Sequence, residues 1–367
     1  SSVLTQIKNT KKITCLQIIP SMGIGGIETG VRDIANYLNK KNIENYILCE
    51  SSDKNFNIKG LKIIKINNLR FKNIFDQNKI KILIKDLIIK KRINLVHISS
   101  RAPAFFLINF IKNLNIKVVT SVHNKYESKS LLKDWYNSYL LKGDTIIFNS
   151  NFVKKSFENY YPKKTKIHVI PRGIDTNYFH PSKKKVIDRN IFIPSRISNW
   201  KGHELLLNYF SLLEQKYKDL FKIHLISSNQ SKEEKKIQLL INKLNLSEKV
   251  IIHKPTLEIN KLYQESYLII NISKRPEGFG RTISEALSSA KTIIAPNQGG
   301  TKEQLFYFDR NLLFNVNSFN SFKKTFKYAL KNYQSISKKG RSYVKKNYSS
   351  DLMCRKTLEV YNQLVSS

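Results

Sequence analysis

The stretch from Pro276 to Ala286 carries the residues best suited to chemistry. It reads PEGFGRTISEA and follows an apolar run, predicted to be a strand, that ends near Ile272. A glycine-containing loop between a strand and a helix directs backbone N–H groups and the positive end of the helix dipole at a bound phosphate. Glycine also lets the main chain approach such a ligand closely. The pattern therefore predicts a phosphate-binding loop, with the helix beginning near Thr282.

Two carboxylates belong to this stretch. Glu285 lies about one turn inside the predicted helix, where it can accept hydrogen bonds from two vicinal ribose hydroxyls, and Glu277 precedes the loop, where it can bind sugar hydroxyls. The spacing alone carries no weight, since glutamates recur at this distance by chance, and the alternative is an ordinary helix start with Glu285 in solvent. A second glycine turn, Asn297–Glu303, follows the next strand. Its position beside the same crevice favours a ligand site.

Cationic residues and a histidine follow other predicted strands. Arg196 and Lys201 share a loop, and a fork-shaped guanidinium with a point-charge ammonium suits a diphosphate; the alternative is a solvated basic turn. His123 follows the strand Lys117–Val122, at the carboxyl end of a parallel sheet, where such sheets bind ligands. A lone histidine is otherwise usually structural.

Apolar periodicity places these residues on alternating strands and helices. The first half is predicted to contain strands at Ile13–Ile19, Tyr46–Cys49, Leu61–Ile66, Leu95–Ser99, Lys117–Val122 and Thr145–Asn149. Its helices are predicted at Thr29–Asn39, Asn78–Arg92, Ala104–Asn113 and Leu131–Lys142, and a glycine turn, Gly23-Ile24-Gly25-Gly26, follows the first strand. Such alternation is typical of a parallel sheet covered by helices on both faces.

The alternation restarts at Ile167–Ile170, and a polar, lysine-rich linker is predicted at Pro181–Arg189. Further strands are predicted at Ile191–Pro194, Lys222–Ser227, Val250–His253, Leu268–Ile272, Thr292–Ala295 and Leu312–Phe314, and helices at His203–Lys216, Lys232–Leu244, Thr282–Ala290 and Asp351–Val365. The expected fold class is α/β, with two Rossmann-like domains facing each other across a cleft. Residues 1–180 form the first domain and residues 181–350 the second, and the helix in residues 351–367 packs back on the first.

Charge is the most unusual feature of the composition. The chain of 367 residues has 64 Lys+Arg against 27 Asp+Glu, a net charge of +37. Such a field attracts polyanions, but the basic residues are spread along the whole chain and no aromatic-interleaved RNA-binding motif accompanies them, so no nucleic-acid partner is expected. The three cysteines fit neither a disulfide framework nor a zinc site. The polar N-terminus and the short apolar runs predict a cytoplasmic protein, with attachment to the cytoplasmic face of the inner membrane as an alternative.

Four blocks resemble, in order, motifs of glycosyltransferase family 4, a retaining family with the GT-B fold. They are SMGIGGIETGVRDIANYL, HVIPRGIDTNYFHP, SRISNWKGHELLL and PEGFGRTISEALSSAKTIIAPNQGGTKE. The blocks are similar to the family's N-terminal glycine loop and first helix, its domain-joining segment, its diphosphate-binding turn and its donor-binding signature. SSRAPAFF and TSVHNKY further resemble the branch that builds lipopolysaccharide core and related bacterial envelope glycans.

The resemblance implies roles for individual residues. Glu277 and His123 are the candidate catalytic residues, the first contacting the transferred sugar and the second facing it. The implied donor site consists of Gly25, Gly26, Arg196, Lys201, Gly278, Phe279, Gly280, Arg281 and Glu285. Arg101 and Arg172 are candidates for contact with the acceptor or a phosphate. In a retaining, same-face mechanism the leaving phosphate takes the acceptor's proton, so His123 is expected to position or to hydrogen-bond.

The implied partners are a nucleotide-sugar donor and a glycan or lipid-linked acceptor; a soluble acceptor is the competing enzyme hypothesis. No cofactor or metal is expected. The chain contains no D-x-D tripeptide, and cationic side chains with a helix dipole can neutralise a diphosphate instead. Ala290-Lys291 departs from the family, which usually has glycine after this helix.

An anionic membrane surface is a further candidate partner. The predicted helix Asn78–Arg92 interleaves isoleucines and leucines with lysines, among them Lys81, Lys85 and Lys90. It is either a crossover helix packed on its sheet or a membrane-surface contact.

Overall fold

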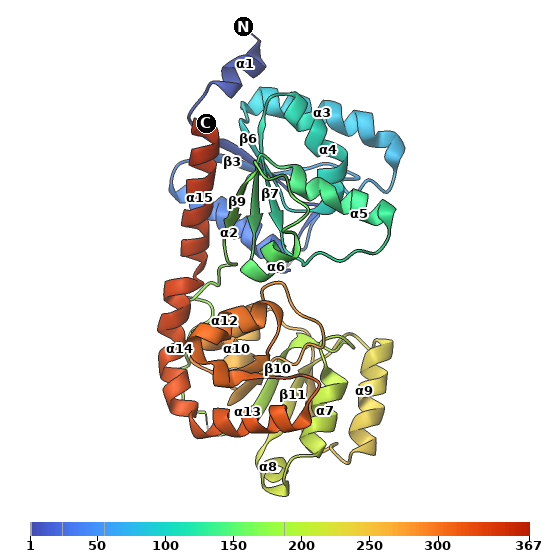
Figure 1. Cartoon of the computed structure of the whole chain (residues 1–367), viewed down its shortest axis with the longest axis vertical. Coiled ribbons are helices and arrows are strands. Elements are labelled where there is room, and N and C mark those ends of the chain that lie inside the picture. The colour runs from blue at the N-terminus through green and yellow to red at the C-terminus, as the bar shows by residue number, and fades with distance from the viewer. Residues whose placement is uncertain (1, 24, 55, 187) are drawn as a thin grey trace. The chain divides into compact units, whose positions relative to one another are not determined.

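The computed structural model describes residues 2–23, 25–54, 56–186 and 188–367 (Figure 1). Ile24, in the middle of the predicted glycine turn, and Ile187, in the predicted linker, lie outside the described residues. The chain divides into two compact units, residues 1–173 with 350–367 and residues 174–349. Both are parallel sheets covered by helices, so the α/β fold predicted from the sequence is confirmed.

The sheet of the first unit has the strand order β5-β3-β1-β6-β7-β8-β9, and all described pairings are parallel. Its strands are β1 (Thr14–Ile18), β3 (Glu44–Cys49), β5 (Ile63–Lys65), β6 (Leu95–Ile98), β7 (Lys117–Val122), β8 (Thr145–Phe148) and β9 (Lys166–Val169). A small separate pair is formed by β2 (Ser21–Met22) and β4 (Ser51–Ser52). The strands of the main sheet are largely buried because helices cover both of its faces.

The helices of the first unit are α1 (Val3–Lys8), α2 (Gly26–Lys40), α3 (Gln77–Lys91), α4 (Arg101–Asn113), α5 (Leu131–Asn137), α6 (Asn151–Ser156) and α15 (Ser350–Ser366), with 3-10 turns η1 (Ile74–Asp76) and η2 (Ser138–Lys142). Helices α3 and α4 pack on the sheet in one cluster, in which α3 buries Ile80, Ile84 and Ile88 and α4 buries Leu107, Ile108 and Ile111. Helices α2 and α15 pack in another cluster, which includes Cys15, Leu95 and Val119. The last helix therefore completes the core of the first unit. The single helix predicted at 131–142 is α5 followed by η2.

The sheet of the second unit has the order β12-β11-β10-β13-β14-β15. Its strands are β10 (Asn190–Arg196), β11 (Lys222–Ile226), β12 (Val250–His253), β13 (Leu268–Ile270), β14 (Thr292–Pro296) and β15 (Leu313–Phe314). Its helices are α7 (His203–Ser211), α8 (Gln215–Leu220), α9 (Lys232–Lys243), α10 (Ile259–Gln264), α11 (Arg281–Ser288), α12 (Gly299–Asp309), α13 (Phe319–Lys331) and α14 (Tyr333–Asn347), with a 3-10 turn η3 (Arg310–Leu312). The single helix predicted at 203–216 is two helices, α7 and α8.

The boundary between the units lies seven residues before the predicted one at 180/181. Residues 174–180 belong to the second unit because its polar groups hold them there. The Arg341 guanidinium donates from Nη1 to the carbonyl oxygens of Thr176 (2.9 Å) and Phe179 (3.0 Å). Ile174 is fully buried in the core of the second unit. The predicted linker thus begins after the chain has already entered the second unit.

Helix α11 ends with a left-handed residue that is not glycine. Ala290 has φ +55°, and the N–H of Lys291 donates to the carbonyl oxygen of Ala286 at 2.9 Å. This is the helix end that normally uses glycine, since a Cβ makes the left-handed conformation unfavourable. The predicted helix end at Ala290 is therefore two residues too late, because that residue already turns away.

Replacing Ala290 with Gly is expected to stabilise the protein, since glycine adopts this conformation without strain. The gain in the free energy of unfolding should be about 1 kcal/mol, measured by urea denaturation. Ala290→Val is the matched control and should lower stability, because a β-branched residue is worse at positive φ. A glycine variant no more stable than the original chain would contradict this account.

Candidate functional site

The strand order of the second unit creates a crevice at one sheet edge. From β10 the chain moves outward to β11 and β12, then returns to the other side of β10 for β13. The loops that leave the carboxyl ends of β10 and β13 therefore diverge, and parallel sheets bind ligands at such a switch point. These two loops, residues 197–202 and 271–280, hold Glu277 and four of the residues predicted for the donor, namely Lys201, Gly278, Phe279 and Gly280.

The two loops lie in direct contact. Gly202 has φ +81°, and a Cβ on it would lie 2.0 Å from the carbonyl oxygen of Ile272. The N–H of Lys274 donates to the carbonyl oxygen of Trp200 at 2.8 Å. The start of α12, which follows the loop after β14, joins them, since the N–H of Gly300 donates to the carbonyl oxygen of Glu277 at 2.7 Å. The two loops and this helix start are thus fixed through their backbones.

Glu277 is held by donors from both sides of the crevice. Its Oε1 accepts from Lys201 Nζ at 2.5 Å and from Ser273 Oγ at 2.6 Å, and its Oε2 accepts from Asn271 Nδ2 at 3.3 Å. Its side chain is 9% exposed. A carboxylate has about four acceptor positions, so one remains for a ligand hydroxyl. Asn271 and Ser273 were missed from the sequence, although polar residues directly after an apolar strand are the expected signal.

Glu285 lies on α11, buried at 8% exposure. Its Oε1 is 3.9 Å from Nε of Arg281, one turn earlier on the same helix. The fully buried Tyr263 of α10 lies beside it, and burial together with the charge of Glu285 raises the pKa of Tyr263 well above its usual value. The alternative of a solvated Glu285 is therefore wrong.

The other residues predicted for the donor in this unit are Arg196 and the loop of residues 278–280, whose backbone is held by hydrogen bonds. Phe279 is buried, with its ring 5.7 Å from the ring of Tyr348. The carbonyl oxygens of Phe279 and Gly280 accept from Gln304 Nε2 at 2.6 and 2.8 Å. Gly278 precedes them in the same loop, which leads into the N-terminus of α11. Arg196 ends β10 with an exposed side chain.

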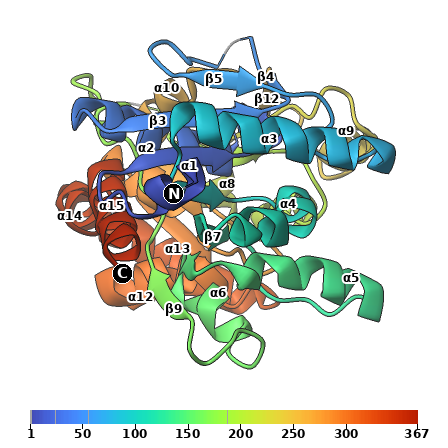
Figure 2. The same cartoon turned by 90° about the horizontal axis from the view of Figure 1, so that it is seen from above.

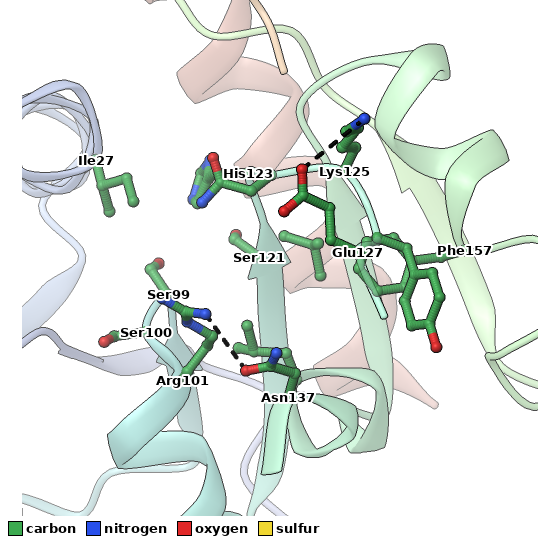
Figure 3. Close-up of a pocket in the computed structure, with 14 residues that line it drawn as sticks. Ile27, Ser99, Ser100, Arg101, Ser121, His123, Lys125, Glu127, Asn137 and Phe157 are labelled. Carbon is green, nitrogen blue, oxygen red and sulfur yellow. Dashed lines mark hydrogen bonds and ion pairs between the residues drawn. The ribbon is translucent and has the colours of Figure 1, made fainter. Parts of the chain in front are cut away.

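The first unit has its own switch point, between β1 and β6. A cavity of about 220 Å³ lies there, at the carboxyl ends of β6 and β7 (Figure 3). Arg101 and His123 line it from the start of α4 and the end of β7. Nη1 of Arg101 donates to Oδ1 of Asn137 at 3.4 Å, and Lys125 and Glu127 form an ion pair at 3.9 Å on the opposite side.

His123 also lines a second, smaller cavity of about 50 Å³, together with Arg172 and Asn149. Within the described residues, neither ring nitrogen of His123 has a hydrogen-bond partner, and both are buried. Burial, with the nearby charge of Arg172 and His97, lowers the pKa of His123 well below its usual value. The imidazole is therefore neutral at pH 7, with one N–H donor and one acceptor nitrogen available to a ligand.

A buried polar chain below His123 was not predicted. Nε2 of His97 lies 2.6 Å from Ser121 Oγ, and its Nδ1 lies 2.5 Å from the hydroxyl of Tyr361 on α15. Burial lowers the pKa of His97 to about 4, so this ring is neutral as well. Ser121 lines both cavities, so the last helix supports the cavity floor.

Gly25 and Gly26 begin α2 in the first unit. A Cβ on Gly26 would lie 2.7 Å from both terminal nitrogens of Arg172, and one on Gly25 would lie 2.2 Å from Oε2 of Glu28. The Arg172 guanidinium thus lies directly against the helix start. The predicted residues fall into two groups, each assembled within its own unit. Among the described residues, no group of three or more His, Cys, Asp or Glu is placed to hold a metal ion.

Comparison with known proteins identifies the family. Residues 24–178 match the model described as Glycosyltransferase Family 4, and residues 175–348 match that described as Glycosyl transferases group 1. A crystal structure of a glycosyltransferase from Rickettsia africae ESF-5 is 30% identical, with a TM-score of 0.85 over 97% of this chain and 99% of that one. The chain belongs to glycosyltransferase family 4. It is a glycosyltransferase with the GT-B fold, as the sequence motifs predicted.

Other relatives differ in what they make. The O-antigen biosynthesis glycosyltransferase WclY of Escherichia coli is 24% identical over 91% of this chain and 92% of its own length. Mannosylfructose-phosphate synthase of Agrobacterium fabrum is 26% identical, over 43% of this chain and only 38% of its own length. Anabaena Alr3699/HepE, solved with UDP and glucose, shares the fold at 15% identity, with a TM-score of 0.79 over 96% of this chain and all of that one.

Replacing Gly202 with Ala is expected to separate the two loops of the crevice. The added Cβ must move the backbone at Ile272, so the free energy of unfolding should fall by about 2–3 kcal/mol and affinity for a donor nucleotide should fall with it. Urea denaturation and calorimetric titration with UDP measure the two effects. Gly30→Ala is the control, because that glycine lies inside α2 with open space around it. It should leave UDP affinity unchanged, whereas a Gly202 variant with unchanged stability would contradict the close contact.

Proposed function

We propose that this family 4 glycosyltransferase transfers a sugar, with retention of anomeric configuration, from a nucleotide diphosphate to a lipid-linked saccharide in envelope-glycan synthesis. The observation that carries the proposal is the contact between Lys201 and Glu277 across the crevice of the second unit. It places a cation suited to a diphosphate and a carboxylate suited to a sugar side by side, beside the N-terminus of α11.

The donor is bound by complementary charge and by backbone. Lys201 and Arg196 neutralise the diphosphate, and the N-terminus of α11 adds the positive end of its dipole. Glu285 accepts hydrogen bonds from the ribose hydroxyls, since it lies within the helix that follows the phosphate loop. The complex of HepE with UDP and glucose supports a nucleotide sugar of this class as the donor.

Glu277 is assigned to the transferred sugar because its carboxylate is already oriented. Three donors fix it, and one acceptor position remains for a sugar hydroxyl. Positive charge develops on the sugar ring as the bond to the phosphate breaks, and a fixed carboxylate stabilises that charge more in the transition state than in the ground state. Loss of the Glu277 carboxylate is therefore expected to lower the turnover number more than the affinity for the donor.

His123 is assigned a neutral hydrogen bond to the reacting sugar. In same-face substitution the acceptor hydroxyl forms the new glycosidic bond as the donor's bond to phosphate breaks, and the acceptor's proton passes to the departing phosphate oxygen. No protein base is needed in this step. The low pKa of His123 fits this role, since a neutral imidazole does not repel the positive charge that develops on the sugar ring.

The cavity of about 220 Å³ beside His123 is the proposed acceptor site, since its lining is polar and cationic at Arg101 and Lys125. The match to WclY along nearly its whole length supports a saccharide acceptor of the envelope-glycan class. The partial match to mannosylfructose-phosphate synthase supports the second candidate, transfer to a small soluble sugar or sugar phosphate.

Substitution of the two carboxylates should give different kinetic effects. Glu285→Ala should weaken donor binding by about ten- to a hundredfold, the cost of losing charged hydrogen bonds. Glu277→Gln, which keeps the shape and one acceptor oxygen, should lower kcat at least tenfold with little change in donor KM. Donor titration and steady-state kinetics separate the two.

Glu204→Ala is the matched control, because this exposed glutamate lies on the neighbouring helix α7 and should alter neither quantity. The assignment of Glu277 would be wrong if its replacement left kcat within about twofold of the original chain.

Activity is expected to survive chelation, since Lys201, Arg196 and the α11 dipole supply the positive charge that a metal supplies elsewhere. The measurement is the initial rate after dialysis against EDTA, with and without added Mg²⁺ or Mn²⁺. Loss of activity that either ion restores would show that a metal takes part.

A further inference from the structure

Most of the large apolar side chains that the structure shows exposed in the first unit lie in two short segments. The first segment comprises Ile74 and Phe75 at η1 with Ile82 and Leu83 in the first half of α3. The second comprises Leu131, Leu132 and Trp135 on α5. Phe75 is 92% exposed and Leu131 is 91% exposed. We call these segments the α3 tip and the α5 tip. Exposed apolar groups that gather in this way indicate an interaction surface.

Both tips are held rigidly by the elements behind them. Helix α3 buries Ile80, Ile84 and Ile88, which fixes the direction of its opposite face. On α5, the Trp135 ring lies edge-on to Phe105, with centroids 4.9 Å apart. The apolar side chains of the two tips are therefore exposed on helices that are packed against the rest of the unit.

The start of α5 is fixed as well. Ser130 caps the helix by accepting from the N–H of Lys133. The Asp134 carboxylate accepts from Ser128 Oγ at 2.6 Å and from the N–H of Lys129 at 3.2 Å. Leu131 and Leu132 follow the capping residue directly, so the cap holds them at the exposed end of the helix.

Lysines surround both tips. Lys72, Lys79 and Lys85 are exposed around the α3 tip, and Lys129 and Lys133 flank the two leucines of the α5 tip. Four acidic groups lie nearby. On the α3 side, Asp76 is half-buried beside Phe75 and Asp86 is exposed next to Lys85. On the α5 side, the Asp134 carboxylate holds the start of the helix and Glu127 is paired with Lys125. Each tip therefore presents exposed apolar side chains with exposed lysines beside them.

The two tips lie on the same side of the first unit. Helices α3 and α5 both begin at its right-hand edge in Figure 1, and again in Figure 2, which is turned about the horizontal axis. In Figure 2 they are well separated in the other direction. Two separated apolar points on one side fit a flat, extended surface better than the single continuous patch of a protein interface.

We propose that the α3 and α5 tips are anchors for an anionic bilayer. Phe75, Leu131, Leu132 and Trp135 enter the headgroup region, and the lysines around them bind anionic lipid. The inference rests on the proposed function, since a lipid-linked acceptor would be met at this surface, and it names the residues that make the contact. The proposed contact also differs from the one considered from the sequence, which used the lysines along the whole of α3. Lys81, expected to face lipid, is half-buried with its ammonium 5.8 Å from the Phe110 ring centroid.

The first test is flotation of the full chain with vesicles of phosphatidylcholine alone and with about one-third phosphatidylglycerol. We expect binding only to the anionic vesicles. The combined variant Phe75→Ser, Leu131→Ser, Leu132→Ser should bind at least tenfold more weakly. Leu220→Ser with Leu239→Ser is the control, because these leucines of the second unit are also exposed, at 59% and 70%. The control variant should bind like the original chain.

The second test reports insertion directly. The chain has two tryptophans, so Trp200→Phe leaves Trp135 as the sole indole probe. Its emission should shift to shorter wavelength on anionic vesicles and be quenched by lipids brominated near the headgroup. An unchanged spectrum on bound vesicles, or equal flotation of tip and control variants, overturns the proposal. If the tip variant instead changes the oligomeric state, the surface binds a second copy and the proposal is also wrong.

A thermal-shift screen of nucleotide sugars distinguishes failure of this inference from failure of the proposed function. The tip variant should keep the same donor-induced stabilisation as the original chain, because its changes lie in the first unit's surface. Vesicle binding without stabilisation by any nucleotide sugar would reject the proposed function and leave the anchors standing. Donor stabilisation without vesicle binding would reject the anchors alone.

Discussion

The donor crevice depends on a backbone contact that leaves no room for a side chain. Gly202 lies over the carbonyl oxygen of Ile272, so the loop after β10 and the loop after β13 form one rigid structure. Lys201 precedes this contact and Glu277 follows it, which is why residues 76 positions apart meet at 2.5 Å. Because catalytic stabilisation requires groups that do not reorganise during the reaction, this backbone contact suits the roles proposed for Lys201 and Glu277.

The first unit places two neutral histidines beside its cavities, in addition to the charged groups that line them. His123 and His97 are both buried and neutral. His97 joins Ser121, at the cavities, to Tyr361 on the last helix. A buried polar chain is rigid only when its members are bonded to one another, which ties the cavity floor to the return of α15 to this unit. The site residues of this unit thus depend on a helix almost at the end of the sequence.

The strands and their order of appearance could be predicted because parallel strands buried on both faces leave long apolar runs, as at Lys117–Val122. The phosphate loop could be predicted because glycine before a helix is a local signal. Three features could not be. The contact of Lys201 with Glu277 is a tertiary contact between distant loops, the polar chain from His97 to Tyr361 spans most of the sequence, and the left-handed turn at Ala290 contradicts the propensity of that residue. Helix α13 was missed although Phe322, Phe326 and Ala329 have helical spacing. Helix α14 gives a weaker signal, because it buries only Ile336, Gly340 and Val344.

The lysines of the chain differ in burial, and this difference bears on what each of them can bind. A net charge of +37 draws any polyanion toward the surface, so specificity for a donor must come from geometry. Lys201 is partly buried and paired with a carboxylate, whereas the lysines around the α3 and α5 tips are exposed. Salt screens exposed charges within about 10 Å at 0.1 M but acts less on partly buried pairs. On the proposed assignments, ionic strength should therefore weaken attachment to a membrane surface much more than binding of a diphosphate at Lys201.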